Sequence, residues 1–195
     1  TVLMSLVAEV LPQVVGALQA VDPDERGAAL NQLAQLVDTS LNDDAAALAA
    51  YLRDSGAVGV IVDLVDEPDP WTHQTALLLL GNLASDAFDP ASRESKALFK
   101  EACGFARLLP HLYAEDRLTL VYALGAVQNL CTDMDYVIEL QSSGATSRLQ
   151  ELAQSDDDNV SRFATGCLAN MRETILADAG VQQWRVRNAH AAATV

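Results

Sequence analysis

Three asparagines, Asn82, Asn129 and Asn170, are the residues whose type and spacing best suit binding chemistry. Each lies 25 or 26 residues after a glycine that is typical of a turn; these glycines are Gly56, Gly104 and Gly144. A side-chain amide offers both a donor and an acceptor, so it can pair with the N–H and C=O groups of another backbone without reading side chains. The constant spacing predicts that the asparagines hold equivalent positions in a repeat, where each amide either faces a partner or bonds within its own repeat.

Patterns for catalysis or for a metal are missing from the sequence. The three histidines have no metal-ligand spacing, and neither an H-E-x-x-H motif nor a glycine-rich phosphate loop occurs. The run from Asp156 to Asn159 resembles the start of a calcium loop but lacks its Gly and closing Glu. It stands where a helix should begin, so we expect these side chains to cap backbone N–H groups, as the acidic residues of the equivalent turns should. We therefore predict a protein that is not an enzyme and has no metal and no cofactor.

The composition limits the classes of partner that the chain is expected to bind. The chain has 195 residues, half of them apolar, and a formal charge of −15. This charge argues against nucleic acid and against anionic membranes, and it favours a protein or peptide partner, preferably a basic one, unless it serves solubility alone. The three cysteines are odd in number and lie in apolar helical patterns. Free buried thiols indicate a reducing, intracellular compartment, which we expect to be the cytoplasm.

The apolar N-terminal stretch, residues 1–21, is interrupted by Glu9 and Pro12 and has no basic leader or cleavage signal. We interpret it as two amphipathic core helices rather than a membrane span or a signal peptide, and expect no membrane insertion.

The elements that position the asparagines recur along the chain. Each Asn ends an Ala- and Leu-rich helix, and an acidic turn and a shorter apolar helix precede it, which predicts stacked repeats of three helices. When Gln35 is aligned with these asparagines, the apolar residues before it match as well, which adds a degenerate first repeat. We therefore predict an all-α fold and a single domain, 1–195. It would comprise a degenerate repeat at 1–40, clear repeats at 44–86, 94–133 and 135–173, and a partial repeat at 174–195.

Two glycine-related features refine this prediction. The distance from Gly56 to Gly104 is stretched to 48 residues by a segment at 86–94, which we interpret as a mobile or functional loop, or else as a tolerated insertion. Gly180 is expected to start one more second helix, from Val181 to about Ala193.

The repeat resembles the armadillo family. The stretch from Gly56 to Val65 is similar to that family's second helix, and the segments ending in Gly81-Asn82-Leu83, Gln128-Asn129-Leu130 and Ala169-Asn170-Met171 are similar to its third helix. The resemblance implies a right-handed α-solenoid whose third helices line a concave groove for an extended peptide. The implied groove residues are Asn82, Asn129, Asn170 and Gln35 as a ladder, flanked by Gln74, Thr75, Leu78, Val121, Tyr122, Arg162 and Phe163.

One departure from the family bears on the ligand. Importin-α-like members carry a Trp four residues before each Asn, and here Leu78, Gly125 and Gly166 occupy those positions. A Trp–Asn array for lysine stems is therefore not expected.

The resemblance leaves three functions open. The first is a protein-binding scaffold that takes a peptide or partner surface in the groove. The second is an armadillo-type co-chaperone that promotes nucleotide exchange, because Gly125 to Asn129 is similar to a third helix of such proteins. The third is a structural subunit of a large assembly or a fragment of a longer armadillo protein. In the last case the tail from Arg187 to Val195 would lead into an IQ motif, with a calmodulin-like partner only if the chain continues past Val195.

Overall fold

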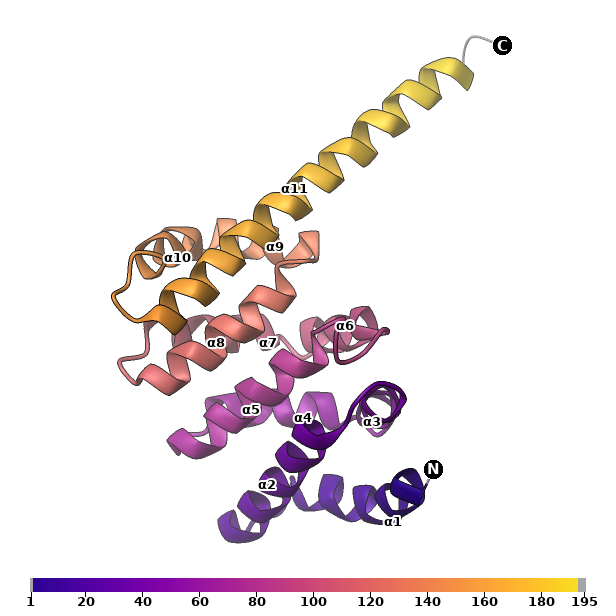
Figure 1. Ribbon diagram of the computed structural model, residues 1–195, viewed down its shortest axis with the longest axis vertical. Helices are drawn as coiled ribbons and strands as arrows, with labels where there is room; N and C mark the ends of the chain where they lie inside the picture. The colour runs from indigo at the N-terminus through magenta and orange to yellow at the C-terminus, as the bar shows by residue number, and fades with distance from the viewer. Residues whose placement is uncertain (1, 193–195) are drawn as a thin grey trace. The chain divides into compact units, whose positions relative to one another are not determined.

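The computed structural model describes residues 2–192, with the side chains of residues 9–180 and 182. Throughout these residues the regular structure is helical and no strand occurs, which confirms the all-α prediction (Figure 1). The elements fall into two compact units, Thr1–Ala126 and Val127–Val195, and each is described by itself. The single domain expected from the sequence stays a prediction.

The first unit contains most of the helices. They are α1 (Val2–Ala17), α2 (Pro23–Thr39), α3 (Asp43–Asp54), α4 (Ala57–Asp63) with the 3-10 turn η1 (Leu64–Asp66), α5 (Pro70–Leu83), α6 (Ser92–Glu101), α7 (Gly104–Leu108) with the 3-10 turn η2 (Leu109–Tyr113), and the first three turns of α8 (Arg117–Leu130). Helix α2 packs beside α5, and α3 and α4 pack against α6. The N-terminal stretch forms one helix with Pro12 inside it, so the prediction of two helices there was wrong.

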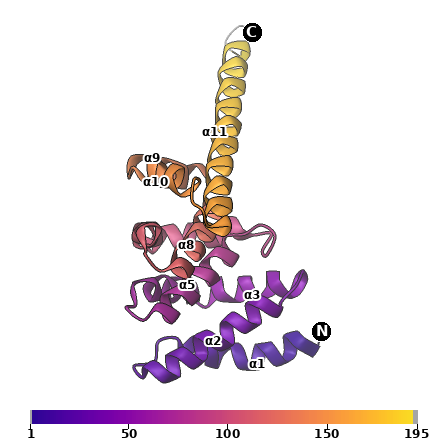
Figure 2. The same ribbon diagram turned by 60° about the vertical axis from the view of Figure 1, so that its left-hand side comes forward.

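The second unit contains the end of α8, α9 (Met134–Ser142), α10 (Ala145–Leu152) and α11 (Asp158–Ala192). Helices α9 and α10 pack against the start of α11, where Val160, Ala164, Cys167 and Met171 are buried. Helix α11 continues without a turn through Gly180 (Figure 2). The predicted second helix from Val181 therefore does not form separately. The tail at 187–195 lies outside the described side chains.

The core is aliphatic, as the composition predicts. Side chains such as Leu30, Leu33, Ile61 and Leu77 are completely buried. Burying each side chain of this size is worth about 1.5–3 kcal/mol. Cys131 and Cys167 are also buried, but Cys103 is exposed, which corrects the expectation that all three thiols are internal.

The turns between first and second helices require a left-handed residue. Gly56 and Gly144 fill this position with φ of 75° and 78°. In the middle repeat, however, the residue with positive φ is Cys103, at 54°, and Gly104 is the first residue of α7. Gly104 is needed for another reason, because a Cβ there would overlap the Phe99 ring.

This correction moves the middle repeat by one residue. Counted from Cys103, Asn129 lies 26 residues on, the same distance as in the other two repeats. The buried residue five positions on is then Leu108, the counterpart of Ile61 and Leu149. Counting five positions from Gly104 instead would give Leu109, which is only half-buried.

Aspartates cap the long helices that carry the predicted site. The side chain of Asp69 accepts a hydrogen bond from the Thr72 backbone N–H at 2.9 Å. Asp116 does the same for Thr119 at 2.8 Å, and Asp157 for Val160 at 3.1 Å. These bonds confirm the capping prediction. The Thr72 hydroxyl and then its N–H lower the pKa of Asp69 below the ordinary aspartate value, and the Thr119 N–H and then its hydroxyl lower the pKa of Asp116.

Neither a metal cluster nor a membrane span is indicated for the part of the chain that the structure describes. No group of three or more potential ligand side chains gathers there. No single helix in that part has both the length and the apolar character to cross a bilayer, although the bent pair Asp43–Asp54 and Ala57–Asp66 meets the length and composition test.

Candidate functional site

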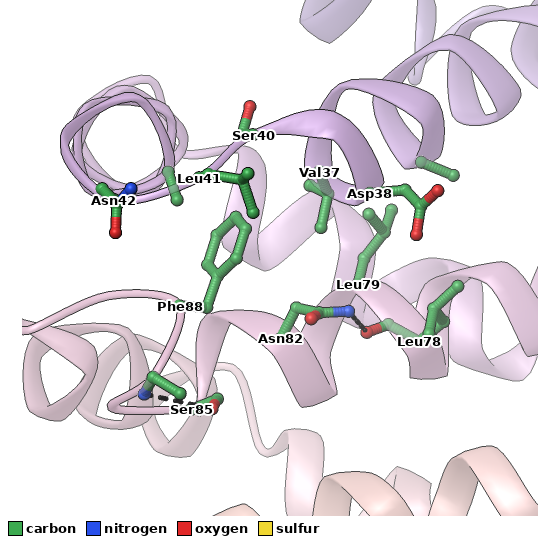
Figure 3. Close-up of a pocket in the computed structure, with 13 residues that line it drawn as sticks. Val37, Asp38, Ser40, Leu41, Asn42, Leu78, Leu79, Asn82, Ser85 and Phe88 are labelled. Atoms are coloured by element: carbon green, nitrogen blue, oxygen red, sulfur yellow. Dashed lines mark hydrogen bonds between the residues drawn. The ribbon is translucent and has the colours of Figure 1, made fainter.

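A cavity of about 350 Å³ opens in the first unit between the C-terminal ends of α2 and α5 and the segment that follows α5 (Figure 3). We call it the α2–α5 cavity. Its walls are mainly apolar, and polar groups stand among them. The lining residues are Ala34, Val37, Asp38, Ser40, Leu41, Asn42, Ala45, Leu78, Leu79, Asn82, Ser85, Ala87 and Phe88. Two of the predicted site residues, Leu78 and Asn82, are among them.

Asn82 lies one helical turn after Leu78 on α5, so both side chains face the cavity. The Asn82 Nδ2 donates a hydrogen bond to the Leu78 carbonyl at 2.9 Å, within its own helix. This bond uses one of the two donor hydrogens of the amide and fixes the orientation of the group. The second N–H and the Oδ1 keep their capacity for a ligand.

The segment between α5 and α6, residues 84–91, forms one wall of the cavity. We call it the α5–α6 connection. Buried charges hold it against the helices. Asp89, with 1% of its side chain exposed, pairs with Arg53 of α3, which is 9% exposed. Its Oδ1 also accepts the Ala91 N–H at 2.9 Å. A buried charge is strongly destabilising without a partner, so this pair ties the connection to the helix behind it.

A second set of polar contacts holds the start of the same connection. Asp86 accepts a hydrogen bond from Ser92 and lies 3.9 Å from the ammonium group of Lys96, whose side chain is 5% exposed. The connection is thus anchored at Asp86 and at Asp89, and Phe88 between them faces the cavity. The expectation of a mobile loop does not fit these contacts.

The opposite rim is formed by the turn between α2 and α3. Leu41 on this rim is 72% exposed, which is unusual for a large aliphatic side chain. The next residue, Asn42, has φ of 52° and ψ of −122°, a backbone conformation that non-glycine residues rarely adopt. Asp38 is the one charged residue among those that line the cavity.

The other predicted residues of the first unit lie elsewhere. Gln74 does not face the cavity, because its Nε2 donates to the Asp116 carboxylate at 2.8 Å and to the Thr119 hydroxyl at 3.0 Å, which links α5 to the start of α8. Gln35 is exposed on α2, and Tyr122 is half-buried on α8. The structure therefore brings together Leu78 and Asn82 but not the whole predicted set.

In the second unit, the predicted residues divide into two groups. The Asn170 Nδ2 donates to the Gln128 carbonyl at 2.8 Å, so this amide bridges α11 to α8 rather than bonding within its own helix. Asn129 is half-buried, and its backbone carbonyl accepts from Thr132 at 2.9 Å.

Arg162 and Phe163 form the other group, at the N-terminal end of α11. The Arg162 guanidinium lies 4.8 Å from the centroid of the Phe163 ring and donates to Asn159 at 3.2 Å. This pair presents an aromatic surface already in contact with a cation of its own chain.

Sequence reasoning missed the residues that complete the cavity: Ala34, Val37, Asp38, Ser40, Leu41, Asn42, Ala45, Leu79, Ser85, Ala87 and Phe88. One signal pointed to Ser85, Ala87 and Phe88, namely the stretched spacing between Gly56 and Gly104, and none pointed to the residues between α2 and α3. The contacts that give the α5–α6 connection its place join residues far apart in the sequence.

Comparison with solved structures identifies the fold. One designed armadillo repeat protein superposes with a TM-score of 0.70 at 23% identity, over 87% of this chain and 71% of its own. The chain has an armadillo-like fold. An engineered protein gives a TM-score of 0.70 at 22% identity over 83% of this chain, which spans 62% of that protein. Another designed armadillo repeat protein, solved in complex with the peptide (KR)4, gives 0.69 at 23% identity over 82% of this chain and 63% of its own. The likeness makes the present chain an all-α solenoid of armadillo-like repeats.

No protein-family model matches the sequence, and a search of curated proteins gave no match.

Proposed function

We propose that this chain is a non-enzymatic protein-binding scaffold, and that it holds an extended peptide along its third helices at the α2–α5 cavity. The observation that carries the proposal is the position of Asn82. Its amide is oriented by one internal hydrogen bond and keeps an N–H and an oxygen at the mouth of a cavity of about 350 Å³. Those two groups match the C=O and N–H of a peptide backbone.

The fold and the charge support this proposal. A protein with a similar fold was solved with a peptide bound. The peptide was (KR)4, and the net charge of −15 on the present chain would attract a basic peptide. Attraction of this kind accelerates association more than it raises affinity, so we expect the affinity to fall as salt is added.

Peptide binding can be tested by titrating fluorescent (KR)4, and a neutral peptide of the same length, into the full chain. We expect (KR)4 to bind, and Asn82→Ala to weaken binding by roughly 1–3 kcal/mol because a hydrogen bond to the peptide backbone is lost. Gln150→Ala is the matched control, since it removes an exposed amide from α10. The thermal midpoint of each variant shows whether the fold is intact.

Two results would contradict the proposal. One is an affinity that Asn82→Ala and Gln150→Ala leave equally unchanged. The other is failure of every peptide to bind to a folded chain.

A further inference from the structure

We propose that the α2–α5 cavity selects one large apolar side chain of the bound peptide, with a basic residue next to it, and that the α5–α6 connection determines this selectivity. The inference rests on the proposed function and extends it. Asparagines that pair with a backbone read no side chains, whereas this cavity would make one position of the peptide specific.

The walls of the cavity suit an apolar side chain. Val37 and Leu41 approach from the α2 side, Leu78 from α5, and Phe88 from the α5–α6 connection. Leu41 is largely exposed and Phe88 is half-exposed, so apolar surface that would be stable against a partner is left in contact with water. Residues that anchor interfaces typically enter such pockets at the centre of a contact.

The anchoring of the connection makes this wall ready for binding. The Arg53–Asp89 pair is buried, and Asp86 is bonded to Ser92. Phe88 is therefore held in place before the peptide arrives, so little conformational freedom is lost on binding. A preformed wall of this kind gives selectivity among side chains of different size.

The negative charge at the rim of the cavity favours a basic residue next to the apolar residue of the peptide. Asp38 is exposed on the rim, and neither Lys nor Arg is among the residues that line the cavity. The Asp38 side chain therefore carries the two carboxylate oxygens available at the rim. A Lys or Arg beside the apolar residue would meet this carboxylate, while an acidic residue there would be repelled.

The cavity is large enough to hold a large apolar side chain of a peptide. Its volume of about 350 Å³ lies near the lower end of the range of roughly 300–1,000 Å³ that is typical of small-molecule sites. Its rim residues Asp38, Leu41 and Asn42 are exposed, and Asn82 stands at its mouth. A ligand that continues past the rim, as a peptide does, would use these groups as well as the walls.

The test uses blocked nine-residue peptides of alternating Ser and Ala, with Lys on each side of a central residue that is Leu, Phe, Ala or Glu. For the unaltered chain we expect the Leu and Phe peptides to bind about ten-fold or more tightly than the Ala peptide, as burial of a large apolar side chain implies. The Glu peptide should bind most weakly.

Phe88→Ala should reduce the preference for Leu over Ala to less than about three-fold, because it removes one wall of the cavity. Leu41→Ala should reduce it as well, and because Leu41 is 72% exposed this variant has little effect on folding. The matched control is Leu118→Ala on α8, which is 42% exposed and does not line the cavity. It should leave the preference unchanged.

The outcomes separate this inference from the proposed function. Asn82→Ala should weaken the Leu and Ala peptides equally, whereas Phe88→Ala should weaken only the Leu and Phe peptides. Peptides that bind with no central preference, or a preference that survives both Phe88→Ala and Leu41→Ala, would overturn the inference and leave the scaffold proposal standing.

Two further results would also overturn it. If none of these peptides binds, the inference is wrong, and if (KR)4 fails to bind as well, both proposals are wrong. If acetyl-leucine amide alone binds as tightly as the Leu peptide, the cavity is a small-molecule site.

Discussion

Two connections that join a third helix to the next first helix differ in length and in the contacts that hold them. The α5–α6 connection takes residues 84–91 to pass from a third helix to the next first helix, while residues 131–133 suffice between α8 and α9. The short one is closed by a local bond, in which Asp133 caps α9 by accepting the Asp135 N–H at 3.0 Å. The long one is held by Asp89, whose partner Arg53 lies 36 residues earlier.

The difference shows what the additional residues of the α5–α6 connection do. A cap is all that a turn requires, so the short connection contains little else. The long connection reaches back to the previous repeat with a buried ion pair and places Phe88 at the cavity. A buried ion pair rarely stabilises more than apolar residues would, but it specifies one geometry, and a binding wall needs one geometry.

The largest expected effect comes from breaking that ion pair. Asp89→Ala leaves the Arg53 guanidinium buried without its main partner, and we expect a loss of about 3–5 kcal/mol in the free energy of unfolding, measured by urea denaturation. At the short connection, Asp133→Ala removes only a cap and should cost about 1 kcal/mol.

A double variant separates charge from packing. Arg53→Met combined with Asp89→Leu removes both charges, so it should lose much less stability than Asp89→Ala alone. Equal losses for Asp89→Ala and Asp133→Ala would show that the two connections are held by forces of the same size.

A smaller effect is expected at the turns that follow the two connections. The left-handed residue is Cys103 after the long connection and Gly144 after the short one, and both are exposed. Gly144→Cys should cost about 1–2 kcal/mol, because a Cβ is unfavourable in this conformation. Cys103→Gly should gain up to about 1 kcal/mol, since relief of strain is partly offset by the freedom of glycine in the unfolded chain.

Thermal and urea unfolding of this reciprocal pair measure both changes. If Cys103→Gly destabilises the chain, the cysteine side chain has a contact that outweighs its backbone conformation.

The smallest effect is expected from acid. Eight residues after the left-handed position, the middle repeat has His111 where the other two have Leu64 and Leu152. Burial, and next the neighbouring His73 ring with its centroid 5.1 Å away, lower the pKa of His111 below 6.5. The unfolded chain therefore takes up this proton more readily than the folded chain does. Stability is complete above about pH 6.5 and is lost as the pH falls towards the pKa of the folded state.

The measurement is the free energy of unfolding between pH 8 and pH 5.5 for the unaltered chain and for His111→Gln. Glutamine retains an N–H for the Val65 carbonyl, which His111 Nε2 contacts at 3.1 Å. We expect a shallower acid loss in the variant. Identical pH profiles would show that this histidine does not contribute to acid sensitivity.

The sequence allowed the third helices and their caps to be predicted, because both depend on residues close in the chain. The period of apolar residues placed Asn82 near the end of α5, and Asp69 stands directly before that helix. Both features follow from helix geometry and the free N–H groups of a first turn.

The errors have physical reasons. A glycine is the usual signal for a left-handed turn, but Gly104 accommodates the Phe99 ring, and Cys103 adopts the positive φ instead. Gly180 can remain helical, since a glycine alone does not end a helix. The cavity could not be predicted, because the contact of Arg53 with Asp89 depends on how α3 packs, and sequence patterns do not specify such a contact.

Gly166 on α11 lies against the side chain of Gln128, which restricts the residues that can occupy position 166. The Gln128 side chain lies so close that a Cβ at residue 166 would approach its amide carbon to 2.7 Å. Any larger residue at this position, four residues before Asn170, therefore requires the flexible end of the Gln128 side chain to move. A smaller residue at 128 would make room at residue 166 without a shift of this side chain.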